Sequence, residues 1–305
     1  MNGTGTQIDP YVVETAADLY EMKNIGSEEA YFKLGADIDF NETEYAGSYE
    51  PITFFAKEFD GCGHTIRNIY SSSSDTARLF YDKCAGSTVF KNLNIENAVL
   101  IGALVQLFAP DAQREKTAEF ENCRFHITAN EGTLSSSSSE GFFNKLKYSV
   151  KMKYCTVLID LRTGRHRSIL RSSALTGCQF RLNITYDLIA ISSTSHSFFY
   201  DVKCVDTAFI GKIKARTETP RTANFSMSGS FNNCYQAIEY ENITSVNWDS
   251  TIAAPCFYDK ELTGGITVGN SNSSSENNQR IFALTTEQCK DAAYLRSTGY
   301  VCAGE

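Results

Sequence analysis

The chain is poor in proline, tryptophan and long apolar stretches. Five prolines and one tryptophan among 305 residues exclude collagen-like and proline-rich architectures. No apolar stretch approaches 18 residues, so we expect no membrane-spanning helix and no membrane partner. The first residues contain neither a basic region nor an apolar segment, so we expect no secretory signal peptide. The formal net charge of −8 makes the whole chain a poor candidate for binding nucleic acid.

Hydrophobic and aromatic residues, by contrast, are plentiful. The chain is 42% hydrophobic and 12% aromatic, which is enough to form a core and favours strands. Ten cysteines are dispersed along it without any Cys-x-x-Cys pair, and the four histidines are scattered. This spacing predicts neither a small disulfide scaffold nor a zinc site. We therefore expect no metal and no cofactor.

A repeat of about 28 residues runs through the middle of the chain. Each copy has an apolar residue, two turn-like residues, and then a small or apolar residue that opens a short alternating strand. That last position is taken by Leu93, Cys123, Cys155, Cys178, Cys204 and Cys234. A second series of apolar pairs, including Leu79-Phe80 and Phe198-Phe199, keeps the same spacing. Each repeat therefore holds at least two strands.

No repeat contains the 10–15-residue amphipathic pattern of a crossover helix. The sequence therefore predicts an all-β fold, a single-stranded right-handed parallel β-helix (solenoid) of about six to eight coils. We expect an N-terminal cap at 1–60, the β-helix coils at 61–250 and a C-terminal cap with a closing helix at 251–305. Serine-rich and asparagine-rich stretches at 71–74, 134–139 and 270–278 are predicted to be loops between strands.

Capping boxes predict short helices in both caps, because a solenoid must cover the two ends of its core. Thr15 and Asp18 open the first helix, which should end near Gly26. Thr285 and Gln288 open the second helix, which is predicted to continue beyond Asp291.

Both ends resemble one family of β-helix proteins. The similarity covers about 100 residues and includes 3–19, 31–40, 256–264 and 284–292. It is strongest at Phe59-Asp-Gly-Cys-Gly-His-Thr-Ile, where the family pattern has a polar residue in place of Cys62. The chain thus resembles phage virion and bacterial surface β-helix proteins related to the adhesins that carry GLUG-type repeats.

This resemblance implies a binding or structural protein and no particular reaction. Because no export signal is visible, we expect a phage virion protein made in the host cytoplasm: a capsid decoration, fibre or tail-associated subunit. Its partners would be other virion proteins, host-surface glycan and copies of itself, and the family suggests a trimer. The alternative is a bacterial cell-surface adhesin.

Five cysteines share one position of the repeat and should point inward as a ladder of buried thiols: Cys123, Cys155, Cys178, Cys204 and Cys234. Equivalent side chains on adjacent parallel strands point the same way, which fits disulfide geometry poorly. We predict reduced, structural thiols throughout, ten in all.

Charge is distributed unevenly. Residues 1–60 carry a net charge of −10, and residues 141–181 carry +8. The basic band consists of Lys145, Lys147, Lys151, Lys153, Arg162, Arg165 and Arg167. The alternating lysines should lie on the outer face of a strand, either as a solvated surface or as an electrostatic contact for an acidic partner.

An enzyme is the third possibility, since a polysaccharide depolymerase would place two carboxylates roughly 5–9.5 Å apart on a lateral groove. Asp82, Asp111 and Asp201 follow the apolar pairs of three repeats. Asn144 and Arg171 take that position in the copies between them and interrupt the carboxylate line. We therefore predict no catalytic residues.

Overall fold

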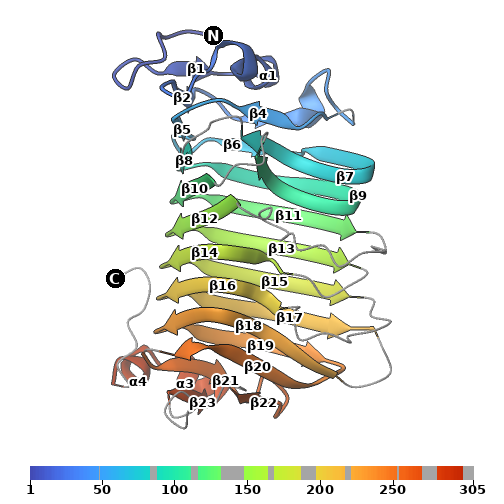
Figure 1. Ribbon diagram of the computed structural model, residues 1–305, viewed down its shortest axis with the longest axis vertical. Helices are drawn as coiled ribbons and strands as arrows, with labels where there is room; N and C mark the ends of the chain where they lie inside the picture. The colour runs from blue at the N-terminus through green and yellow to red at the C-terminus, as the bar shows by residue number, and fades with distance from the viewer. Residues whose placement is uncertain are drawn as a thin grey trace.

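The computed structural model is a stack of parallel β-coils with its long axis running from the N-terminal to the C-terminal end (Figure 1). It describes residues 1–47, 49–82, 88–110, 116–131, 148–163, 168–186, 197–216, 221–252, 254–269 and 280–297. Every strand pair among these residues is parallel, apart from an isolated antiparallel bridge between Asn2 and Val12. The predicted parallel β-solenoid is confirmed.

Two long sheets form the sides of the stack, and successive coils contribute strands to both. The 11-stranded sheet, here sheet A, contains in spatial order β1 (Tyr11–Val13), β2 (Tyr31–Leu34), β5 (Glu58–Asp60), β8 (Thr88–Lys91), β10 (Lys116–Glu121), β12 (Tyr148–Lys153), β14 (Leu170–Thr176), β16 (Ser197–Val205), β18 (Arg221–Asn232), β20 (Ile243–Ile252) and β22 (Thr267–Gly269).

The 12-stranded sheet, here sheet B, contains β3 (Ile38–Asp39), β6 (Thr65–Arg67), β9 (Asn94–Pro110), β11 (Arg124–Glu131), β13 (Thr156–Thr163), β15 (Gln179–Tyr186), β17 (Ala208–Ala215), β19 (Tyr235–Glu241), β21 (Cys256–Asp259) and β23 (Ile281–Leu284). Two further strands, β4 (Ile52–Phe54) and β7 (Tyr70–Asp82), extend this sheet beside the long strand β9. A short 3-10 turn, η1, spans Phe40–Glu42.

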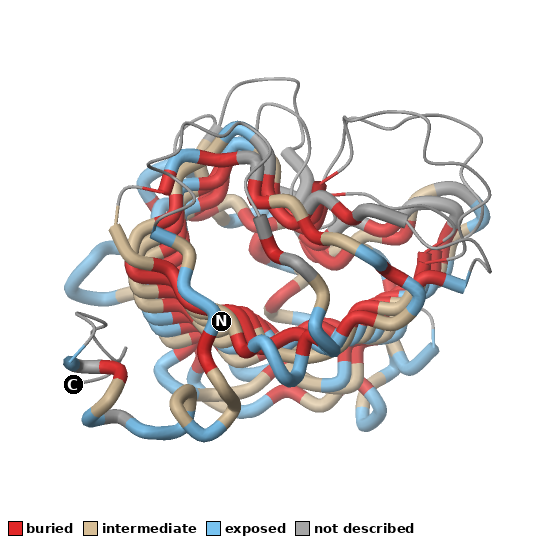
Figure 2. The backbone as a smooth tube through the Cα atoms, turned by 90° about the horizontal axis from the view of Figure 1, so that it is seen from below, coloured by how far each residue is buried: buried red, intermediate tan, exposed pale blue. Residues whose placement is uncertain are grey.

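The core lies inside the coils, because alternate residues of strands such as β13 and β15 are buried. Figure 2 shows buried residues recurring along the stacked coils. Phenylalanines stack from coil to coil, and the rings of Phe90 and Phe120 lie nearly parallel with centroids 4.9 Å apart. Trp248 is fully buried and donates its indole N–H to Gln236, whose amide hydrogen-bonds Tyr240. The polar groups of this core segment are thus paired with each other.

The N-terminal helix α1 (Ala16–Ile25) covers one end of this core. Its capping box is present as predicted, with the Thr15 hydroxyl accepting from the Asp18 N–H and the Asp18 carboxylate accepting from the Thr15 N–H. The helix ends at Gly26, and its buried residues Leu19 and Met22 join the main core.

The C-terminal helix differs from the prediction in two respects. It is broken into α3 (Thr286–Lys290) and α4 (Ala292–Ser297), because the Asp291 carboxylate accepts the N–H groups of Ala293 and Tyr294 and starts a new helix. Leu295 packs with Phe257 and Leu284 in a cluster separate from the main core. Since Phe257 lies on the outer side of sheet B, these helices cover the side of the last coils.

The prediction of a loop at residues 71–74 is wrong. These serines belong to β7, in which Ser71, Ser72 and Ser73 pair with β9. Backbone pairing with the next coil outweighs the weak strand propensity of serine. The other two predicted loops, at 134–139 and 270–278, lie outside the described residues.

Candidate functional site

A corner between the two sheets places one residue of each coil in a buried vertical line, the corner column. Strand register assigns it Leu93, Cys123, Cys155, Cys178, Thr207, Cys234 and Cys256. The residue before each column position has a positive φ from Asn92 to Asn233, which turns the chain sharply from sheet A into sheet B. Asparagine, aspartate and glycine tolerate this conformation and supply five of those six turns; Tyr154 supplies the other.

Cys204 is the exception in the predicted ladder. It pairs in register with Leu175 and Phe231, three residues before the corner, and Thr207 takes the column position of that coil. The Cys204 thiol nevertheless lies close enough to Cys234 in the column for the two thiols to affect each other's pKa. The sequence match at Asp201-Val-Lys-Cys204 was therefore offset by three residues, although the side chain is buried beside the column as expected.

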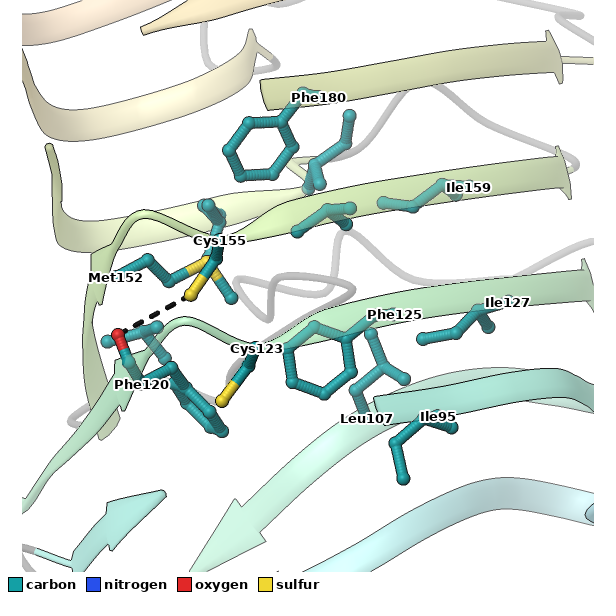
Figure 3. Close-up of a cluster of buried hydrophobic side chains, with 14 of the residues drawn as sticks. Ile95, Leu107, Phe120, Cys123, Phe125, Ile127, Met152, Cys155, Ile159 and Phe180 are labelled. Carbon is teal, nitrogen blue, oxygen red and sulfur yellow. Dashed lines mark hydrogen bonds between the residues drawn. The ribbon is translucent and has the colours of Figure 1, made fainter. Parts of the chain in front are cut away.

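Four cysteines and the threonine of the column share one hydrogen bond. The sulfurs of Cys123, Cys155, Cys178 and Cys234 lie 3.3–3.4 Å from the carbonyl oxygen two residues earlier, and the Thr207 hydroxyl makes the equivalent bond at 2.9 Å. Figure 3 shows the further contact from Cys155 to the Phe120 carbonyl, 3.4 Å long. In the coils after Leu93, the position therefore holds a small side chain with one donor.

These thiols are poor nucleophiles. Hydrogen bonding with Cys123 raises the pKa of Cys155 to about 12, and burial raises the pKa of Cys204 and Cys234. Because the thiolate is the reactive form, such side chains are inert packing groups. All eight cysteines in the described part of the chain are free thiols, while Cys84 and Cys302 lie outside it.

The outer face of sheet A carries part of the predicted basic band. Lys151 and Lys153 project outward from β12 and face acids one coil earlier, with Nζ–Oε distances of 2.8 Å to Glu119 and 3.8 Å to Glu121. A third pair joins Lys91 to Glu58 at 2.6 Å. These lysines therefore form cross-strand ion pairs in which neighbouring coils carry opposite charges.

The remaining members of the basic band do not extend this ladder. Arg162 lies on β13 in sheet B, so the corner separates it from the lysines of sheet A. Lys145, Lys147, Arg165 and Arg167 lie outside the described residues.

Tyr154 marks the boundary between the two outer faces. Its side chain is 56% exposed, and the Lys153 ammonium lies 5.1 Å from the centre of its ring. The ring lies over Gly177 in the next coil, where an added Cβ would come within 2.6 Å of the ring. Gly177 therefore makes room for the ring to lie against the corner.

The outer face of sheet B holds a cleft of about 460 Å³. It spans the four strands β13, β15, β17 and β19, and its outward-facing lining residues are Leu158, Asp160, Arg181, Asn183, Ile210, Lys212 and Glu239. Register divides all seven into two parallel lines: Leu158, Arg181 and Ile210 in one, and Asp160, Asn183, Lys212 and Glu239 in the other.

Most polar groups of the cleft are already paired. The Asn183 amide donates to Asp160 at 2.7 Å, and the His126 ring lies 3.9 Å from the same carboxylate. The Lys212 ammonium lies 2.9 Å from Glu239 and 3.1 Å from Glu241. Hydrogen bonds to these two glutamates raise the pKa of Lys212, so its charge is retained across the physiological range.

Arg181 differs from these neighbours. Its side chain is exposed, and within the described part of the chain it has no hydrogen bond or ion pair. Leu158 and Ile210 occupy the equivalent outward positions on the strands before and after it. Sequence reasoning missed this site, because the signal is two outward apolar residues on either side of an arginine and emerges only when the register of three coils is known.

The carboxylates considered for a depolymerase are not assembled in the described residues. Asp201 sits at a kink in β16 with a positive φ and accepts a hydrogen bond from Ser172. Arg171 pairs in register with Tyr200 and stacks on its ring, with 4.3 Å between the guanidinium carbon and the ring centre. Asp82 is the last described residue of β7, and Asp111 and Asn144 lie outside the described residues.

Among the residues that the structure describes, no group of three or more histidine, cysteine, aspartate or glutamate side chains is arranged to hold a metal ion. No helix in that part of the chain is both long enough and apolar enough to cross a membrane.

Known proteins that this chain is similar to include a partial relative and a distant structure. No protein-family model matches the chain. A segment of 108 residues is 34% identical to Halomucin of Haloquadratum walsbyi; it makes up 33% of this chain and spans about 1% of that relative's length. A crystal structure from Bacteroides ovatus, provisionally described as an immunoglobulin A1 protease, aligns over 97% of this chain and 90% of its own with 17% identity and a TM-score of 0.46.

Proposed function

We propose that this chain is a β-solenoid module of a surface protein and acts by attachment. The observation that carries the proposal is the 108-residue similarity to Halomucin, which favours a surface protein over the other roles considered. Because the segment spans so little of Halomucin, the similarity supports a shared module type.

The architecture suits attachment. Parallel pairing connects every coil to the next, and one continuous apolar core runs from Val13 to Val268. A rigid stack of this kind holds the side chains of its outer faces at fixed spacings of about 4.8 Å from strand to strand. Rigid elements position binding groups more accurately than loops do, so the outer faces are the natural contact surfaces.

Binding without catalysis is part of this proposal. Incubation of the full chain with host wall or capsular polymer should release no new reducing or unsaturated ends. Release of such ends would identify the protein as a depolymerase and overturn this part of the proposal.

Location tests the surface assignment directly. Intact cells of the source organism should expose the chain to a membrane-impermeant biotin reagent, with a cytoplasmic enzyme as the unlabelled control. The phage virion role expected from the sequence resemblance predicts the opposite distribution, with the chain abundant in purified particles and unlabelled on cells. That result would replace the surface assignment.

A further inference from the structure

We propose that the cleft on sheet B binds a carboxylate-bearing sugar of an acidic polysaccharide through Arg181. This inference rests on the proposed attachment function and names the chemical class of its ligand. The cleft volume of about 460 Å³ lies within the range of small-ligand sites, roughly 300–1,000 Å³.

Charge pairing identifies Arg181 as the anion-binding group. Lys212 is held by Glu239 and Glu241, and the Asp160 carboxylate accepts from Asn183. Arg181 is the remaining cation among the residues that line the cleft, and it has no partner within the described residues. A guanidinium presents a planar fork of donors that matches a carboxylate with two parallel hydrogen bonds.

The neighbours of Arg181 favour a sugar over a small inorganic anion. Leu158 and Ile210 provide apolar contact on either side of it, at equivalent positions one strand away. The second line of the cleft offers amide, carboxylate and ammonium groups at Asn183, Asp160 and Lys212, which can bind hydroxyl groups as donors and acceptors. An acidic sugar ring combines a carboxylate, hydroxyls and an apolar face in one ligand.

The position of the cleft favours a polymer. It crosses four successive strands of sheet B, so successive sugars of a chain can contact equivalent positions on neighbouring coils. Sheet A also has a depression, which is smaller and lined in part by Lys151 and Lys153. Both lysines face glutamates, Glu119 and Glu121, so no unpaired cation is found among the residues that line this depression.

The test compares the full chain on immobilised alginate and on the same polymer after its carboxyl groups have been reduced to alcohols. Wild type should bind alginate at least about tenfold more tightly than the reduced polymer. Arg181→Gln should lose at least about tenfold in affinity for alginate and bind the reduced polymer as wild type does. Lys203→Gln is the matched control, because Lys203 is an exposed cation on sheet A.

Each outcome separates the inference from the broader function. Equal losses for Arg181→Gln and Lys203→Gln would indicate unspecific charge attraction and overturn the site, as would failure of wild type to prefer alginate. If the chain is exposed on cells and Arg181→Gln attaches to its target as wild type does, the surface role stands and the site fails. If Arg181→Gln loses alginate but the chain is absent from the cell surface, the site stands and the surface role fails.

Discussion

Sheets A and B are built from the same coils, yet cations on their outer faces have different neighbours. On sheet A, Lys151 and Lys153 each face a glutamate of the preceding coil. On sheet B, Arg181 stands between two apolar side chains without a partner in the described residues. Exposed cross-strand ion pairs contribute only about 0.2–1 kcal/mol each, so the pairing on sheet A is a modest aid to coil alignment.

The difference indicates where a ligand can gain free energy. A charge already paired must lose its partner before it can bind an anion, whereas an unpaired guanidinium exchanges only water. In the predicted basic band, the described lysines Lys151 and Lys153 are therefore exposed to solvent and neutralised by neighbouring glutamates. Arg181, a cation between two apolar side chains, lies on the other side of the corner.

The largest expected difference is in cysteine reactivity between the surface and the interior that the two sheets enclose. Cys62 is exposed and should react with a thiol reagent in the native protein, and Cys289 more slowly. The cysteines of the corner column should react more than about a thousandfold more slowly, because they become accessible only on unfolding. Mass spectrometry in denaturant should then count ten labelled thiols. Fewer than ten would indicate disulfides and contradict the predicted reduced state.

Gly211 underlies the cleft on sheet B and should be the most sensitive single position on that face. Its φ is +134°, and an added Cβ would lie 2.0 Å from the Leu182 carbonyl oxygen. Gly211→Ala should cost at least about 1–3 kcal/mol in free energy of unfolding, measured by denaturant titration. Gly177→Ala is the control, because there the added atom meets the movable ring of Tyr154 and the loss should be smaller.

Acid should weaken sheet B near its N-terminal end, where its charges are paired. Hydrogen bonds from Arg67 and Asn68 hold the pKa of Asp39 below its usual value of 3.8. The resulting stabilisation is fully present above pH 3.8 and is lost as pH falls through the lower native pKa. Asp39→Asn should flatten the decline of melting temperature below about pH 4. An unchanged decline would assign it to other carboxylates.

Reversing one charge on sheet A should cost less. Lys151→Glu places two acids opposite each other and should lower the free energy of unfolding by up to about 1 kcal/mol. Glu119→Lys alone should do the same, and the double variant with exchanged charges should recover most of the loss. A loss in the double variant equal to the sum of both single losses would mean that the pair does not interact.

Arg181→Gln should have the smallest effect on stability, within about 0.5 kcal/mol of wild type in thermal or denaturant unfolding. An exposed side chain without a partner contributes little to the folded state. A larger loss would show that Arg181 holds the sheet together, which would place it in the same class as the lysines of sheet A.

The stack itself could be predicted because its signal is local and repeated. Inward residues such as Phe125 and Ile127 alternate in every copy, and the turn before each cysteine recurs. Register within a coil was harder to predict, as Cys204 demonstrates. Thr207 takes the place of a cysteine in the column with a side chain of similar size and the same hydrogen bond. A prediction based on cysteine spacing therefore chooses Cys204, the nearest cysteine.

The cleft could not be predicted because its lining residues lie on four strands, whose equivalent positions are 23 to 29 residues apart in sequence. Leu158, Arg181 and Ile210 look unrelated until pairing aligns them. Likewise, the acids that neutralise Lys151 and Lys153 lie 32 residues earlier, where a count of charge along the chain assigns them to another segment.

The corner column also governs where the chain can change in length. Successive column positions are separated by as few as 22 residues, between Cys234 and Cys256, and as many as 32, between Cys123 and Cys155. The strands on either side of the corner nevertheless remain in register from coil to coil. Insertions accumulate away from the corner, so new surface segments can be grafted into one coil while the binding face of its neighbours keeps its geometry.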